Sequence, residues 1–87
     1  MIDRGDTIVF KLSDGTMMFY WFVNTINGYM VFFNWYSNPE DPAPTDFWRM
    51  TPRWFKEKVK EGKIEVFDSF PKEYNDIFTQ QANNQAY

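Results

Sequence analysis

Residues Thr16 to Tyr36, TMMFYWFVNTINGYMVFFNWY, decide the fold of this chain. Two runs of apolar and aromatic residues flank Asn27-Gly28. This dipeptide is typical of a two-residue hairpin turn, because such a turn needs a positive φ at both central positions. The stretch therefore predicts two antiparallel strands, Thr16–Asn24 and Tyr29–Tyr36, joined by a tight turn.

Both faces of this hairpin are apolar, whereas an antiparallel sheet with one wet face alternates between apolar and polar residues. One face would carry Met17, Phe19, Trp21, Val23, Tyr29, Val31, Phe33 and Trp35, and the other Met18, Tyr20, Phe22, Met30, Phe32 and Tyr36. Three interpretations are open. Helices cover one face and something else covers the second, the sheet curls into a small barrel, or the second face is a binding surface.

The segments before and after the hairpin add strands and a loop. Asp6–Leu12 has strand composition and is followed by a turn at Ser13–Thr16. Ser37–Asp46 contains three of the five prolines and is predicted to be a loop, because proline removes backbone donors. Phe47–Met50 is either a short strand or a hydrophobic staple before the next helix.

Two helices and one more strand follow. Thr51-Pro52 has the residues of a helix start, and Gly62 those of a left-handed helix end. The helix Pro52–Glu61 would turn Trp54, Phe55 and Val59, with Lys58 alongside, towards the core. Lys63–Phe67 is a strand, and Pro71–Gln80 is the second helix.

The predicted fold class is α+β: an antiparallel meander sheet of three to four strands, flat or curled like a barrel, packed against two short helices in the order βββ-loop-αβα. A chain of 87 residues predicts one domain, here residues 1–80. The polar residues 81–87 are predicted to be a disordered tail.

The residue inventory argues against an enzyme. The chain has no histidine and no cysteine, so the usual base at neutral pH, the thiol nucleophile and the common transition-metal ligands are missing. We expect a non-enzymatic protein without a cofactor or metal. No apolar run has the length of a signal peptide or of a membrane span, so we expect a cytoplasmic protein, of a cell or of a host cell, with no membrane partner.

The hairpin is the first candidate binding surface. Aromatic residues and Met are enriched at interface cores, and we expect two short helices to be too little material to cover both faces of the sheet. The hypothesis is a protein partner, or a second copy in a homodimer. The residues predicted to make the contact are Tyr20, Phe22, Phe32 and Tyr36, with Trp48 at the rim.

The segment 49–63 is the second candidate, because it has six basic and two acidic residues and thus a local charge of +4, within a chain of net charge −3. A nucleic-acid surface would use Arg49, Arg53, Trp54, Lys56 and Lys60. A solvated amphipathic helix explains the same pattern, and the interleaved Glu57 and Glu61 weaken the nucleic-acid interpretation.

Two further hypotheses concern the proline-rich loop. A pocket between this loop and the sheet could capture a small aromatic or nucleotide ligand. The acidic residues of Asn38–Asp46, together with Asp3, Asp6 and Asp14, could imitate phosphates, although acidic surfaces more often only keep a protein soluble.

No motif of a known family is found in the chain. Residues 5–16, GDTIVFKLSDGT, are similar to the first strand and turn of many small SH3-like barrels, although the helix between the third and fourth predicted strands departs from a simple barrel. In length, aromatic richness and lack of catalytic residue types the chain resembles the small accessory proteins that phages encode. That resemblance implies a viral inhibitor that binds host machinery.

Overall fold

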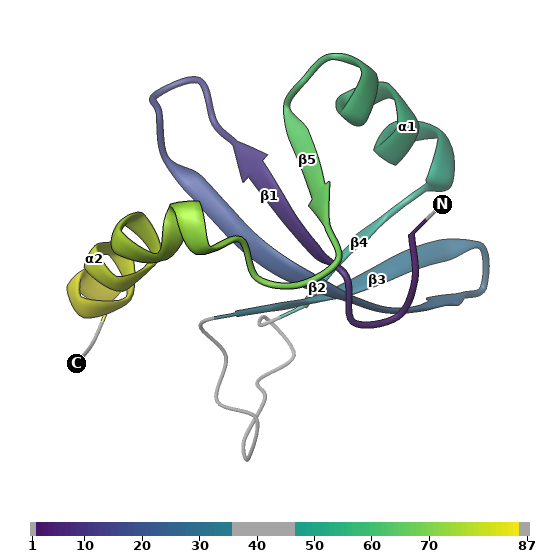
Figure 1. The fold of residues 1–87 in the computed structure, drawn as a ribbon. Helices are drawn as coiled ribbons and strands as arrows, with labels where there is room; N and C mark the ends of the chain where they lie inside the picture. Colours follow the sequence, from purple (N-terminus) through teal and green to yellow (C-terminus); the bar gives the residue numbers. More distant parts are fainter. Residues whose placement is uncertain (1, 36–46, 86–87) are drawn as a thin grey trace.

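A computed structural model of the chain describes residues 2–35 and 47–85, excepting the side chains of 81–85 (Figure 1). Its elements are β1 (Thr7–Lys11), β2 (Met17–Ile26), β3 (Tyr29–Asn34), β4 (Phe47–Met50), α1 (Pro52–Lys60), β5 (Ile64–Phe67), the 3₁₀ turn η2 (Lys72–Tyr74) and α2 (Asn75–Gln85). The strands form one antiparallel sheet of five strands in the order β4-β3-β2-β1-β5. The predicted α+β class is therefore confirmed.

The local signals in the sequence act as expected. Asn27 and Gly28 have φ of 52° and 82°, as the hairpin turn between β2 and β3 requires. The hydroxyl of Thr51 accepts a hydrogen bond from the N–H of Trp54 at 3.1 Å and caps α1. Gly62 follows the end of α1 with a φ of 78°. The observed ends of β2, β3 and α1 lie within two residues of the predicted ends.

Phe47–Met50 is a strand, β4, which was one of the two predicted alternatives. It pairs with β3, and the sheet has five strands where three to four were predicted. The second helix begins as the 3₁₀ turn η2 and continues through Gln85. It thus extends into the segment that was predicted to be disordered.

The sheet is strongly curled. Phe10 of β1 and Trp48 of β4 lie three strand spacings apart along the sheet, which is about 14 Å if the sheet is flat. Their ring centroids are 5.3 Å apart. A register shift between Phe22 and Asn24 in β2 marks a bulge, which increases the local twist and bend. The face that carries Phe10 and Trp48 is therefore concave, and we call it the inner face and its opposite the outer face.

The inner face holds the main core, and α1 closes it. Its buried residues are Ile8, Phe22, Met30, Phe32, Met50 and Ile64, each no more than 7% exposed. Trp54 and Phe55 of α1 pack on this cluster. Val59, predicted to face the core, is instead 39% exposed, because curling lets a shorter stretch of helix close the concave side.

The outer face is covered only in part. Phe19, which is fully buried, contacts Phe70, Tyr74 and Phe78 at centroid distances of 5.4, 6.2 and 5.3 Å. Phe70 precedes η2, Tyr74 belongs to η2, and Phe78 belongs to α2. In Figure 1, α1 and α2 lie at opposite ends of the molecule. Trp54 and Phe55 of α1 pack on the inner face and Phe78 of α2 packs on Phe19, so the two helices contact different faces of the sheet.

Candidate functional site

The structure corrects the predicted partner-binding surface. Phe22 and Phe32 are 7% and 0% exposed and belong to the inner core, so they are not accessible to a partner in this conformation. Tyr20 and Trp48 are half-buried on the same face, with ring centroids 5.1 Å apart. The prediction named the covered face, because the curling that closes this face could not be inferred from alternation alone. Tyr36 lies outside the described residues.

An accessible apolar surface lies on the outer face, at the end of the hairpin away from α2, and a second hollow, of about 460 Å³, lies on the inner side beside Ile2, Phe55 and Val66. We call the surface on the outer face the outer patch; its members are Ile26, Tyr29, Val31, Phe33, Phe47 and Arg49, which together line a hollow of about 550 Å³. Ile26, Tyr29 and Phe47 are 51%, 44% and 39% exposed. Curvature explains this exposure, since side chains on a convex face diverge and leave space between them.

The register of the strands brings the outer patch together. Ile26 lies opposite Tyr29 across the hairpin, and Phe33 and Val31 lie opposite Phe47 and Arg49 of β4. The bulge in β2 shifts the alternation, so that Ile26 joins the same face as the odd-numbered residues of β3. Three strands with no motif in common thus form one surface.

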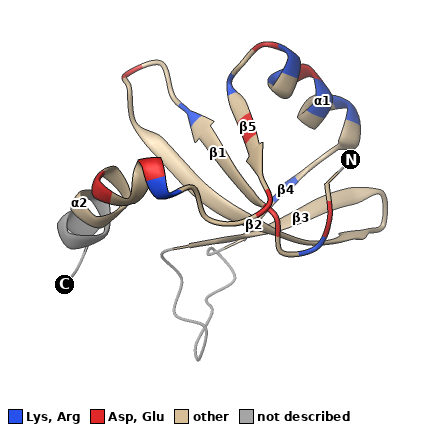
Figure 2. Cartoon of the chain, viewed as in Figure 1, with Lys and Arg blue, Asp and Glu red and all other residues tan. Residues whose placement is uncertain are grey.

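The outer patch contains a single charge. β2 and β3 carry no charged residue, and Figure 2 shows the hairpin without red or blue. Arg49 of β4 lies with its guanidinium 5.5 Å from the centre of the Tyr29 ring. A cation over a ring is mildly attractive, so this contact orients Arg49 at the edge of the hollow.

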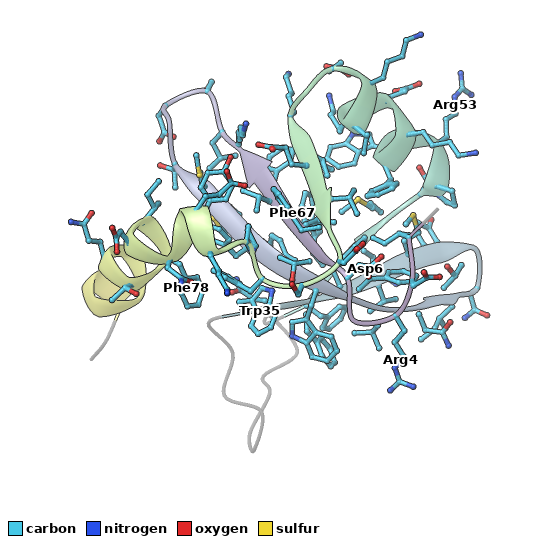
Figure 3. All side chains as sticks on the ribbon, in the orientation of Figure 1. Arg4, Asp6, Trp35, Arg53, Phe67 and Phe78 are labelled. Atoms are coloured by element: carbon cyan, nitrogen blue, oxygen red, sulfur yellow. The ribbon has the colours of Figure 1, made fainter. Side chains whose placement is uncertain are left out.

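The residues predicted to bind nucleic acid are only partly brought together. Arg53, Lys56 and Lys60 follow one another at spacings of three and four along α1, which places them on one side of the helix. Arg53 has a side chain 91% exposed, projects from the fold (Figure 3), and lies 3.5 Å from the carboxylate of Glu57. Arg49 is separate from this row, because it lies on β4 within the outer patch.

Trp54, predicted to stack on a base, is half-buried and packs on the inner core. Its ring centroid lies 6.0 Å from that of Phe10 in a stacked arrangement and 5.5 Å from that of Trp48 in a T-shaped one. The ammonium of Lys58 lies 5.3 Å from the centre of the same ring. Contacts within the protein therefore take up part of the surface of Trp54, and the rest lines a hollow of about 290 Å³.

A polar cluster connects the sheet to the C-terminal segment. Lys11 of β1 forms an ion pair with Glu65 of β5, and the hydroxyl of Tyr74 donates to Glu65 Oε1 at 2.9 Å. The hydrogen bond from Lys11 lowers the pKa of Glu65, and the same bond raises the pKa of Lys11. The bond to Glu65 also raises the pKa of Tyr74. These contacts hold η2 against the edge of the sheet and suggest a structural role.

Replacing Glu65 by glutamine is expected to lower the free energy of unfolding at neutral pH by about 0.5–1 kcal/mol, a modest value because both charges are partly exposed. A carboxyl whose folded pKa is depressed stabilises the fold above its unfolded pKa, and this contribution is lost as pH falls through the folded value. The difference between wild type and Glu65→Gln should therefore shrink towards about pH 3. Urea unfolding at both pH values measures it.

Glu73→Gln is the matched control for this experiment. Glu73 is an exposed residue of η2, the turn that carries Tyr74, and it takes part in none of the ion pairs of the described residues. It should have little effect at either pH. An equal loss of stability for Glu65→Gln at pH values near 7 and 3 would contradict the proposed role of the carboxylate.

Other predicted sites lack support in the described part of the chain. Residues 36–46 lie outside it, and with them the predicted small-ligand pocket beside the proline-rich loop and the loop acids of the acidic surface; Asp3, Asp6 and Asp14 are described. Within the described residues no group of three or more His, Cys, Asp or Glu could hold a metal ion. None of the described helices is long and apolar enough to cross a membrane.

The outer patch was not predicted because Tyr29, Val31 and Phe33 were assigned to the other side of the hairpin and Arg49 to the basic segment. Ile26 and Phe47 belonged to neither candidate surface. Arg49 was the available signal: a charge between Trp48 and Met50 indicates that one face of this short strand reaches water. Comparison of the chain with family models, curated proteins and solved structures finds no match.

Proposed function

We propose that this chain is a non-enzymatic protein-binding module that contacts its partner through the outer patch. The observation that carries the proposal is a hollow of about 550 Å³ between the uncharged hairpin and β4, lined mainly by apolar residues with Asn27 and Arg49 beside them. On small proteins, apolar patches with a polar rim usually mark interaction surfaces. Inhibition of a target protein is one form this function could take, in keeping with the resemblance to phage accessory proteins.

The chemistry of the outer patch suits the centre of an interface. Tyrosine, phenylalanine and arginine are enriched at such centres and supply most binding hot spots. Tyr29 and Arg49 already contact each other, at 5.5 Å, so little side-chain freedom remains to be lost on binding. Phe47, at 39% exposed, offers a ring that a partner could cover.

Placing a charge in the outer patch tests the proposal. Ile26→Asp should weaken binding at least tenfold, because a partner would have to bury an unpaired carboxylate. Val59→Asp is the matched control, since Val59 is an exposed aliphatic residue of α1 outside the patch. Sedimentation at several concentrations measures self-association, and affinity capture from the source cell with the wild type and both variants measures retention of another protein.

The proposal requires the two variants to differ. It is supported if the wild type and Val59→Asp retain the same protein, or form the same dimer, while Ile26→Asp does not. It fails if the wild type is monomeric at all concentrations and retains nothing, or if Ile26→Asp and Val59→Asp behave alike. Circular dichroism of each variant shows whether the fold is intact.

Nucleic-acid binding is a second candidate, favoured by the row of Arg53, Lys56 and Lys60 on one side of α1. Such binding would use phosphate contacts and would weaken steeply with salt. Labelled single- and double-stranded oligonucleotides mixed with the chain at low salt test it. A shift that disappears in Lys56→Glu/Lys60→Glu would support this function, and no shift at low salt would end it.

A further inference from the structure

The outer edge of β4 has main-chain groups that point away from the sheet. The N–H of Trp35 donates to the carbonyl of Phe19 in β2 at 3.0 Å. Because main-chain groups alternate in direction along an antiparallel strand, Met30 and Phe32 of β3 then bond to β4. Their partners are Met50 and Trp48, so the main chain of Phe47 and Arg49 points outward.

β4 is an edge strand. It pairs with β3 on one side, and among the described residues no strand pairs with its other side. An unpaired row of N–H and C=O groups is a template for another strand. Outward groups at Phe47 and Arg49 are therefore available for hydrogen bonds with an extended chain.

A hollow lies on each side of this edge. The first is the hollow of the outer patch, of about 550 Å³, which Phe47 and Arg49 help to line. The second has a volume of about 290 Å³ and is bounded by Trp48, Thr51 and Trp54. Tyr29 and Arg49 line both hollows, so the two meet at this contact. Alternate side chains of an added strand point to opposite faces and would reach one hollow and then the other.

We infer that the partner adds an extended segment to the outer edge of β4, with an acidic side chain beside Arg49 and apolar side chains in the two hollows. The inference rests on the proposed function and deepens it. In strand addition the main-chain bonds provide affinity and pockets for alternate side chains provide specificity. The edge of β4 supplies both.

Charge complementarity selects an acidic segment. The segment 49–63, which begins in β4, has a net charge of +4. None of the ion pairs among the described residues includes Arg49. A carboxylate on the added strand would be able to pair with Arg49 without displacing any acid of residues 2–35 or 47–80, and a basic residue at the same place would be repelled.

A competing explanation is that Arg49 protects the edge, since charged residues on edge strands prevent unwanted pairing between copies. The two explanations differ in what the Arg49→Ala variant does. Protection predicts that Arg49→Ala associates with itself more strongly than the wild type. Recognition of an acidic partner predicts that Arg49→Ala associates with itself no more strongly than the wild type and binds acidic segments more weakly.

The probe is a display library of random linear peptides, presented to the full chain. The wild type should enrich peptides in which apolar residues alternate and one position is acidic. Arg49→Glu should bind these peptides about tenfold more weakly and should select a basic residue at that position. Arg53→Glu is the control, since it makes the same charge change on α1 and should keep the wild-type preference.

Two measurements on an enriched peptide test the geometry. Amide exchange at Phe47 and Arg49 should slow by about tenfold or more when the peptide is bound in excess. N-methylation of the alternate peptide residues whose N–H groups face β4 should abolish binding, whereas methylation of the intervening residues should not. The two methylated peptides are isomers with the same composition, so composition cannot explain a difference between them.

Several results would overturn the inference. The inference is wrong if no peptide is enriched, or if Arg49→Glu leaves the acidic preference unchanged. It is also wrong if the amides of Phe47 and Arg49 exchange at the same rate with and without the peptide, or if their protection arises from a second copy and grows with protein concentration. If Ile26→Asp still abolishes protein binding while β4 gains no protection, the outer patch binds a partner without strand addition. The proposed function then stands and only this inference falls.

Discussion

Replacing Phe32 by alanine is expected to lower the free energy of unfolding by about 3–5 kcal/mol, out of roughly 5–15 kcal/mol for a typical domain. Phe32 is fully buried, with its ring 5.3 Å from that of Phe22 and 6.1 Å from that of Phe55. The substitution would leave a cavity between the sheet and α1. Because the surrounding strands are hydrogen-bonded to one another, they can close this cavity only in part.

Urea unfolding followed by tryptophan fluorescence measures the loss. Phe33→Ala is the control, because Phe33 is the next residue of β3 but faces the outer patch and is only half-buried. It should cost clearly less than Phe32→Ala. If the two substitutions cost the same, the assignment of the inner and outer faces of β3 is wrong.

Replacing Phe19 by alanine is expected to cost about 3–5 kcal/mol as well, but with a different local effect. Phe19 is fully buried on the outer face and lies under the rings of Phe70, Tyr74 and Phe78. These contacts and the Glu65 cluster hold the C-terminal segment on the sheet. Without the ring of Phe19, α2 should separate from the sheet before the sheet itself unfolds.

Hydrogen exchange measured segment by segment tests this order. In Phe19→Ala the amides of α2 should exchange faster while those of α1 change less, and in Phe32→Ala the loss of protection should be greater in α1. Equal acceleration in both helices for both variants would indicate one cooperative unit, and would contradict a separate role for each face of the sheet.

Much of the fold was predictable because local chemistry determines it. Asn27-Gly28 can adopt the positive φ of the turn more readily than most residue pairs, and Thr51-Pro52 starts a helix by the same side-chain bond wherever it occurs. The alternation of Tyr29 to Trp35 correctly separated the two faces of β3. Each of these signals acts over a few residues, so the sequence alone contains it.

The accessible face was not predictable in the same way. Which face is concave depends on contacts such as that between Phe10 and Trp48, 38 residues apart in sequence, with centroids 5.3 Å apart in space. The bulge in β2 then shifts Ile26 to the outer face, and no residue type near Val23 predicts this bulge. The candidate site was therefore found only from the folded chain.

By itself the sequence determined a small α+β protein with a charge-free aromatic hairpin, one basic segment and no histidine or cysteine. Only the tertiary structure decided that α1 closes the inner face and that the outer patch stays open beside β4. The physical reason is curvature: bending the sheet brings side chains together on the concave face and separates them on the convex one. A pattern of alternating residues is identical for both directions of bending, so it cannot tell which apolar face of the hairpin becomes concave.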